Sequence, residues 1–376
     1  MIYYVDSSFT AQGDGSSPEN PLRSHDAIQP KPGDSVLFRR GTSYRSGIYP
    51  PDGGPGAPIS FGAYGEGDEP RFYGSVNASD PRDWVAEGAC VWRYAGTLAS
   101  EACNIVFDYG ESFGVMAWTR DGLDSTGKWF FSAPFSTDHT PADAALLLYS
   151  ESNPAECHRD IEICVFGKRR MATGGRHLRF SDLHFLCSGV HGFAGTDVED
   201  VRIERCKFSF IGGCPWSVEG HIRFGNGVEF WDGARNCVVT GCEFREIYDS
   251  CATTQGPGEN CRQFEEIHID GNRCGNYGMA AFELRDRIGR NVTFNGNSCE
   301  GAGAGFSMQD ETPPRASEIY PEPMGHHIFA WRIEHAWPDG RIEILRNTFA
   351  GVPTGTVFYR RISDAALSQI KTDIEA

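Results

Sequence analysis

Four short stretches of the chain share one alternation of apolar and polar positions. They are residues 227–231, 251–255, 281–285 and 305–309. In each stretch the second and fourth residues are mostly apolar, whereas the third and fifth are polar or flat, as Glu229 and Trp231 are in the first. A period of two is typical of a β-strand that has one face in a core. The pattern therefore predicts four similar strands that turn one set of side chains inward and the other towards solvent.

A second repeat accompanies these strands. Five segments with a strand pattern each end on a small corner residue, and these are Cys206, Cys242, Asn272, Asn297 and Asn347. The polar strand positions follow three of the corner residues at a nearly constant distance of 10 or 11 residues, and they recur every 24 to 30 residues. Two ladders that stay in register indicate a coiled, repeating β architecture, in which stacked asparagines bond from one turn to the next.

The repeat organises the chain as one domain with four parts. We expect an N-terminal cap with the first coils, an irregular insertion or set of widened coils, the regular coils, and a C-terminal cap with a short helix. These parts are residues 1–75, 80–170, 174–362 and 363–376.

Two loops exceed the length that the repeat requires. They are residues 212–224 and 311–327, and each adjoins one of the alternating stretches. Loops inserted on one face of a repeat array usually wall a binding site. A shorter segment in the N-terminal cap, residues 22–28, is compatible with one turn or two of helix.

Composition narrows the class of partner. The 376 residues are 40% hydrophobic and carry a formal net charge of −17, with no apolar run long enough to span a membrane. This charge argues against nucleic acid or an anionic membrane as partner, and against a polyanionic substrate unless a basic cleft or a cation intervenes. We expect neither a metal nor another cofactor, and the sequence does not indicate an oligomeric state.

The chain has 13 cysteines without the spacing of a zinc site. We interpret them as reduced, small, buried side chains rather than a disulfide framework. Met1 leads straight into a strand-like stretch rather than a signal peptide, and the many free thiols favour a cytoplasmic protein.

Several local motifs support a resemblance to a known superfamily. They are residues 3–6, 32–38, 63–65, 148–150, 153–155 and 225–231. With the repeat, they resemble the right-handed parallel β-helix superfamily of pectate-lyase-like and polygalacturonase-like proteins, in particular a bacterial subgroup assumed to be carbohydrate-active. The resemblance implies an all-β fold and a glycan partner. It supplies no catalytic residue, because the polygalacturonase signatures are absent and Gly220-His221 matches only part of one of them.

Two glutamates on the polar face have the arrangement that glycoside hydrolysis requires. Glu229 and Glu283 occupy the same column two coils apart, which places their backbones roughly 9–10 Å from one another. Inverting glycosidases hold their two carboxyl groups about 6.5–9.5 Å apart. We therefore predict these glutamates as the acid/base pair, with Asp232 and Asp286 at the strand ends as further catalytic candidates.

The neighbouring polar positions are candidates for substrate binding. Trp231 offers a flat face for a sugar ring, and Arg285 can hold a carboxylate ionised or bind a hydroxyl group. The remaining candidates line the same groove or its edge, and they are Thr253, Gln255, Gln309, Tyr248, Asp249, His221 and Asp310. A single glutamate on a solvated strand is commonplace, so the prediction depends on the whole set together with the two loops.

Two other functions stay open. A polysaccharide lyase needs a base and a cation that neutralises a uronate carboxylate, for which Arg285, Arg223, His221 and Tyr248 are candidates. A glycan-binding or structural β-helix needs only the aromatic platform. The leading hypothesis is a glycoside hydrolase that acts on a neutral or weakly charged glycan.

Overall fold

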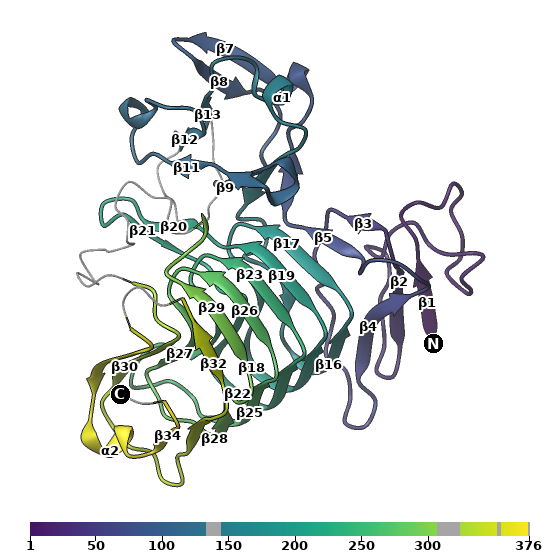
Figure 1. Ribbon diagram of the computed structural model, residues 1–376. Coiled ribbons are helices and arrows are strands. Elements are labelled where there is room, and N and C mark those ends of the chain that lie inside the picture. The colour runs from purple at the N-terminus through teal and green to yellow at the C-terminus, as the bar shows by residue number, and fades with distance from the viewer. Residues whose placement is uncertain (133–143, 307–323, 352–354, 375–376) are drawn as a thin grey trace.

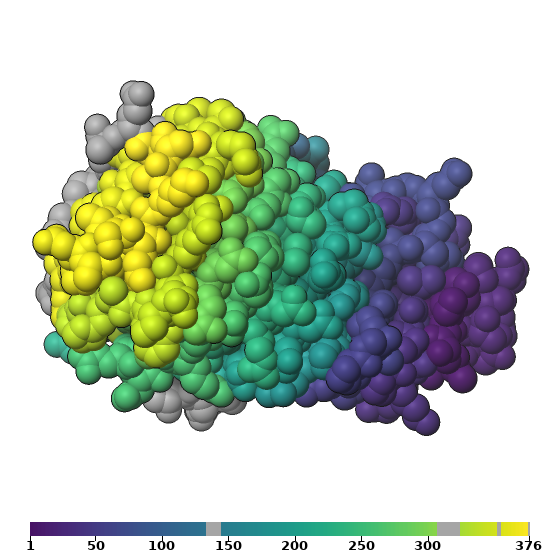
Figure 2. All heavy atoms as spheres, turned by 90° about the horizontal axis from the view of Figure 1, so that it is seen from below, coloured from purple at the N-terminus to yellow at the C-terminus, as the bar shows by residue number. Residues whose placement is uncertain are grey.

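The computed structural model describes residues 1–132, 144–306, 324–351 and 355–374. Its strands stack into the parallel β-helix that the sequence predicts (Figure 1). Successive coils follow one another along one axis, so the colour passes in bands from the N-terminal to the C-terminal end of the molecule (Figure 2).

The larger sheet has 15 strands. Its main path is β1 (Ile2–Val5), β2 (Ser35–Arg39), β4 (Ile59–Tyr64), β16 (Arg176–Ser181), β18 (His191–Glu204), β22 (Val228–Thr240), β24 (Ser250–Gln255), β27 (Ala280–Arg285), β30 (Ile328–Ile333) and β33 (Val357–Ile362). Beside this path lie β15 (Arg170–Thr173), β25 (Phe264–Asp270), β28 (Arg290–Thr293), β31 (Ile342–Ile344) and β34 (Ile370–Thr372).

The larger sheet bends into two faces at a row of aspartates. Asp197 and Asp232 have φ of +52° in the middle of β18 and β22, and Asp286 has φ of +73° directly after β27. Aspartate is among the few non-glycine residues that tolerate this left-handed region. Because of the bend, β22 pairs with β24 through its first half and with β25 through its second half.

The third side of the helix is a sheet of eight parallel strands. They are β3 (Ser43–Tyr44), β5 (Arg71–Tyr73), β17 (His184–Ser188), β19 (Lys207–Ile211), β23 (Glu243–Ile247), β26 (Arg273–Tyr277), β29 (Ser298–Ala302) and β32 (Thr348–Ala350). Inward side chains of all three faces form one core, with stacked aromatic rungs such as Phe208 on Phe244 at 5.1 Å between ring centroids.

The predicted asparagine ladder is present at one corner. Asn272 Oδ1 accepts a hydrogen bond from the Cys242 N–H at 2.9 Å, and the Asn272 N–H donates to Asn297 Oδ1 at 2.8 Å. The Asn297 N–H donates in the same way to Asn347 Oδ1 at 2.8 Å. The side-chain amide of each ladder residue thus satisfies backbone groups of the preceding coil, which keeps the coils in register.

Truncating one ladder residue should be costly. Asn272→Ala removes the acceptor of the Cys242 N–H and the donor to the Val239 carbonyl, and it leaves both groups buried. A buried backbone group without a partner costs about 1–3 kcal/mol, so we expect the variant to lose roughly 2–4 kcal/mol of unfolding free energy. Urea unfolding followed by circular dichroism measures this loss, and a change below about 0.5 kcal/mol would contradict it.

An insertion interrupts the parallel coils after β5. It forms an antiparallel sheet of β10 (Ser112–Phe113), β9 (Ala102–Phe107), β14 (Ile161–Val165) and β6 (Ser75–Asn77). It also forms a mixed sheet of β11 (Val115–Met116), β12 (Lys128–Phe131), β13 (Leu146–Tyr149), β8 (Val91–Tyr94) and β7 (Trp84–Gly88), in which only β11 and β12 are parallel. A short helix, α1 (Pro154–Cys157), precedes β14. The insertion has its own apolar core around Trp129 and lies above the helix in the view of Figure 1.

Both helices expected at the ends need correction. Residues 22–28 contain no helix and run as turns, with Leu22 bridging Val5 as part of a rung. The C-terminal helix α2 (Asp364–Leu367) has only four residues, capped by Ser363 Oγ. It ends early because Ile370 pairs with Ile342 and begins a further strand of the larger sheet, so pairing prevails over the weak helical pattern.

The fourth alternating stretch is not the next strand of the row. The strand beside β27 is β30, which places Phe329 opposite Glu283 and Trp331 opposite Arg285. Phe306 instead packs its ring against Tyr248 and Phe210. The two predicted site residues of that stretch, Gln309 and Asp310, lie outside the described residues.

Most of the cysteines are small, buried side chains, as the sequence predicts. All 13 are free and 11 of them are buried. Their small side chains fill the core and the corners of the coils, as Cys206 and Cys242 do.

Candidate active site

The predicted polar columns lie side by side on the face formed by β22, β24 and β27. Glu229 pairs with Thr253 and Thr253 with Glu283, in one column. Trp231 pairs with Gln255 in the next, and Arg285 occupies the equivalent position on β27. The sequence predicts solvent exposure for these side chains, but Glu229 is only 7% exposed and Glu283 1%. They point out of the helix and are covered by other segments.

A two-stranded hairpin supplies one wall over this face. Its strands β20 (Cys214–Ser217) and β21 (Ile222–Phe224) come from the first of the two long loops. Arg223 fixes the hairpin, because its Nε donates to the Gly213 carbonyl at 2.7 Å and its Nη2 to the Cys103 carbonyl of the insertion at 2.8 Å. His221 stacks on Trp118 of the insertion, with the ring centroids 4.7 Å apart.

The wall and the face enclose a hollow of about 210 Å³, called here the first pocket. Three carboxyl groups line it, those of Glu229, Asp249 and Glu283. Apolar and aromatic surface comes from Trp231, Met279, Met324, Trp216 and Phe224, and positive charge from Arg169, Arg223 and Arg285. A mostly apolar hollow with a few convergent polar groups is typical of a small-molecule or substrate site.

Glu229 is held as an acceptor of hydrogen bonds. Its Oε2 accepts from Gln255 Nε2 at 2.7 Å and from Asn226 Nδ2 at 2.9 Å. Hydrogen bonds from neutral donors stabilise the ionised carboxylate without adding a competing charge.

His191 adjoins the same carboxylate and was not among the predicted residues. Its Nδ1 accepts a hydrogen bond from the Asn226 N–H at 3.1 Å, so the ring proton of the neutral form is on Nε2. Nε2 lies 3.5 Å from Glu229 Oε1 and has no hydrogen-bond partner within the described ranges, although His191 is only 1% exposed. Burial lowers the pKa of His191, so the imidazole is neutral near pH 7.

Glu283 has the opposite environment. Its Oε1 accepts from Trp331 Nε1 at 3.0 Å, and its Oε2 from Ser250 Oγ at 3.3 Å. Burial raises the pKa of Glu283 from 4.5 to about 7, against the opposing effect of Arg285. The Glu283 carboxyl group is therefore partly protonated at neutral pH.

The second polar column on the face under the hairpin contains Trp231 and Arg285, and Trp331 lies beside Arg285. The Arg285 guanidinium lies 5.6 Å from the Trp231 ring centroid and 5.2 Å from that of Trp331, and its Nε donates to Asp286 at 3.4 Å. Thr253, between the two glutamates, is fully buried and its hydroxyl has no hydrogen-bond partner among the described residues.

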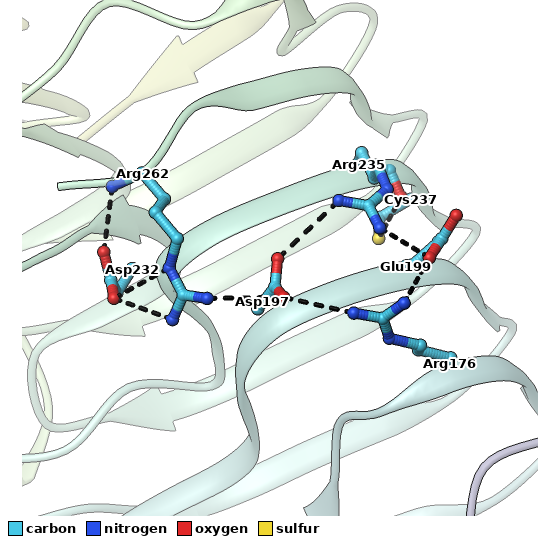
Figure 3. Close-up of polar contacts among 7 residues, drawn as sticks. All are labelled: Arg176, Asp197, Glu199, Asp232, Arg235, Cys237 and Arg262. Carbon is cyan, nitrogen blue, oxygen red and sulfur yellow. Dashed lines mark hydrogen bonds and ion pairs between the residues drawn. The ribbon is translucent and has the colours of Figure 1, made fainter.

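The two aspartates predicted as further catalytic candidates do not line the first pocket. Asp232 accepts hydrogen bonds from the Arg262 backbone and guanidinium, and Arg262 also contacts Asp197 (Figure 3). Burial tends to raise the pKa of Asp232, but the bonds from Arg262 lower it below the usual range. Asp286 is buried and pairs with Arg332 at 2.6 Å. Both aspartates lie at the bend of the larger sheet, where their φ is positive, and both bind arginine side chains there.

The predicted residues of the turn and the loop are placed in two ways. Asp249 and His221 line the pocket, and Asp249 Oδ2 accepts from the Gly225 N–H at 2.8 Å. Tyr248 is buried beneath Arg223, whose guanidinium lies 4.7 Å from its ring centroid. Arg223 also lines the pocket but donates to the Gly213 and Cys103 carbonyls, whereas Tyr248 is not among the lining residues.

The described ranges contain no group of three histidine, cysteine or acidic residues placed to hold a metal ion. No helix within them has the length and apolar character needed to cross a membrane.

No family model matches the chain, and no curated protein is similar to it in sequence. Solved structures share its fold. A GH136 lacto-N-biosidase from Eubacterium ramulus is 15% identical over 96% of this chain and 58% of its own, with a TM-score of 0.51. XylC, solved in complex with xylose, is 11% identical over 93% of this chain and 66% of its own, with a TM-score of 0.50. A pectate lyase is 13% identical over 94% of this chain and 78% of its own, with a TM-score of 0.45.

The similarity shows a parallel β-helix fold. The structural neighbours are carbohydrate-active β-helix proteins, both hydrolases and lyases. This chain spans less than two thirds of the length of the lacto-N-biosidase and of XylC.

Proposed function

We propose that this protein is a carbohydrate-active enzyme that hydrolyses glycosidic bonds in the first pocket. The observation that carries the proposal is the pairing of two unlike carboxyl groups. Glu283 is buried with a pKa of about 7, and Glu229 is held by two N–H donors in the same pocket. Hydrolysis needs one protonated and one ionised carboxyl group on either side of the bond that breaks.

The register supports a single-displacement reaction. One strand separates Glu229 from Glu283, so their backbones lie roughly 9–10 Å apart, which leaves space for a water molecule between the carboxyl groups. Glu283 gives its proton to the glycosidic oxygen as the bond to the anomeric carbon breaks. Water attacks that carbon while Glu229 accepts a proton from the water, and the products are an alcohol and a sugar of inverted configuration.

The other residues of the pocket would bind and orient the sugar. Trp231 and the 54% exposed Trp216 offer apolar faces of the kind that contact pyranose rings. Arg285 carries hydrogen-bond donors, and Gln255 fixes the orientation of Glu229. The substrate that fits these groups at the cleaved bond is a neutral or weakly charged glycan.

A polysaccharide lyase is the second candidate, because two arginines line the pocket besides Arg223. Arg169 and Arg285 both reach it, and a lyase needs cations against the carboxylate of the uronate that it cleaves. The base would then be Glu229, which abstracts the proton next to that carboxylate.

One screen separates these functions. Wild-type protein is incubated with a panel of neutral and acidic glycans, and reducing ends and ultraviolet absorbance of unsaturated uronates are measured in parallel. Hydrolysis gives new reducing ends without absorbance, whereas a lyase gives both. Glycan binding without either product would replace both proposals by a binding protein.

A further inference from the structure

A second hollow lies next to the first pocket and has a different lining. It has a volume of about 360 Å³ and is called here the basic pocket. The residues that give it its character are Asp26, Arg45, Tyr49, Tyr73, Lys168 and Arg170. They come from the first coils, from β5, from the turn after β14 and from the start of β15.

Two of its three cations form no ion pair among the described residues, although the charge of Glu229 attracts Arg170 from beyond ion-pair distance. Arg45 is neutralised by Glu162, with bonds of 2.8 and 2.7 Å. Lys168 and Arg170 form no ion pair within the part of the chain that the structure describes, and Arg170 Nη1 contacts only the Ala194 carbonyl, at 3.3 Å. Asp26, the acid in the lining, bonds to Ser24.

This local excess of positive charge is unusual in a chain with a net charge of −17. Arg170 is also half-buried, and its burial lowers the pKa of the guanidinium. A desolvated cation that has no anion within ion-pair distance is costly, and a bound anion reduces this cost. The charge distribution therefore indicates an anionic ligand.

An aromatic surface lies beside these cations. The Tyr49 side chain is partly exposed, and its hydroxyl donates to the Arg170 carbonyl at 2.8 Å, which fixes the ring. Lys168 Nζ lies 4.4 Å from the centroid of this ring. A fixed ring next to two cations suits a ligand that has both a flat apolar face and a negative charge.

The basic pocket also adjoins the candidate active site. Arg169 lines the first pocket and Arg170 lines the basic pocket. Arg170 bonds to Ala194, which pairs with Glu229 across β18 and β22. A chain of sugars that occupied the first pocket could therefore continue past Arg169 into the second.

We propose that the basic pocket binds an acidic saccharide unit, a sugar that carries a carboxylate or a sulfate ester. The anionic group contacts Lys168 and Arg170, and the sugar ring contacts Tyr49. This binding does not depend on catalysis in the first pocket. The net charge of the chain disfavours a polyanionic glycan unless a basic cleft is present, and the basic pocket is such a cleft.

The test measures binding rather than turnover. Calorimetry is carried out on the full chain with the Glu283→Gln substitution, which prevents consumption of the probe by the proposed reaction. The probes are trigalacturonate, a sulfated disaccharide, sialyllactose, a neutral trisaccharide and inorganic sulfate. We expect at least one acidic saccharide to bind, with an affinity that falls as salt rises, and the neutral trisaccharide to bind without this salt dependence or not at all.

Three substitutions locate the site. Lys168→Met keeps the apolar stem and should weaken the acidic saccharide about tenfold, whereas the same change at exposed Lys31 should leave its affinity unchanged. Tyr49→Ala should weaken the saccharide and not inorganic sulfate, which separates a sugar site from a simple anion site. Failure of every acidic saccharide to bind would overturn the proposal, as would equal affinity in wild-type and Lys168→Met protein. Loss of binding in Trp231→Ala but not in Lys168→Met would also overturn it, by assigning the ligand to the first pocket.

Discussion

The Glu283→Gln variant is expected to lose a factor of about 10² to 10⁴ in kcat/KM on any glycan that the wild-type protein hydrolyses. Glutamine has nearly the same shape and can still accept a hydrogen bond from Trp331 Nε1, but it has no proton of suitable acidity for the leaving oxygen. The affinity for the glycan should remain within a few-fold of wild type, because the pocket keeps its volume and its other groups.

Substrates with different leaving groups distinguish the catalytic acid from the catalytic base. Glu283→Gln should recover much of its activity on an aryl glycoside, whose leaving group needs no protonation. Glu229→Gln should remain inactive on both substrates, because the attacking water still lacks its base. If Glu229→Gln were active while Asp249→Asn was not, the pair would be Asp249 with Glu283, since both line the same pocket.

The pH profile gives a second measure of the same assignment. The proton donor has to be protonated, so hydrolysis should decline as the pH rises through about 7, the pKa of Glu283. Trp331→Phe removes a hydrogen bond that lowers this pKa. The alkaline limb of the profile should therefore move to higher pH in that variant, and a profile that stayed in place would contradict the role of Glu283.

The fold could be predicted because its evidence is local and repeated. The alternation with a period of two and the constant distance from the corner residues predict that Glu229, Thr253 and Glu283 form one column. The observed strand register pairs Glu229 with Thr253 and Thr253 with Glu283. The ladder of Asn272 and Asn297 follows from the same spacing. A single stretch without this support is ambiguous, and the pattern at 305–309 therefore predicted a strand where the chain supplies Phe329 and Trp331 instead.

The pocket itself could not be predicted from the alternation. The alternation predicts that a polar residue on the outer face of a strand is exposed to solvent. It does not show that a hairpin, held in place by Arg223, covers this face. The ring of His191 is held beside Glu229 by the backbone N–H of Asn226, which is 35 residues away from His191 in the chain. The separation of Glu229 and Glu283 into unlike carboxyl groups depends on such contacts, so it appears only in three dimensions.

Glu283→Gln should also change the stability of the protein in a pH-dependent way. The pKa of Glu283 is raised from 4.5 to about 7, so the folded protein keeps a proton between these pH values that the unfolded chain releases. Wild-type stability therefore includes a contribution that is present below pH 4.5 and lost as the pH rises to 7. A shift of this size corresponds to about 3 kcal/mol.

Glutamine does not titrate, so the variant lacks this loss. Between pH 4 and pH 8 the unfolding free energy of Glu283→Gln should move by up to about 3 kcal/mol in favour of the variant, relative to wild type. Urea unfolding at several pH values measures the difference, in which the titration of all other groups cancels. Asp232→Asn is the contrasting control: its pKa is lowered below 3.8, so its deficit relative to wild type should be complete at pH 5–8 and shrink only in stronger acid.

These two effects of one substitution have a common cause. Burial in the first pocket disfavours the charged form of Glu283, which destabilises the folded protein at neutral pH and at the same time keeps a proton available for the leaving group. A variant that is inactive and more stable above pH 7 would show that the pocket maintains this unfavourable carboxyl group for its chemistry. If the difference in stability did not depend on pH, the raised pKa of Glu283 would be contradicted. The reason to choose Glu283 as the proton donor would then be lost.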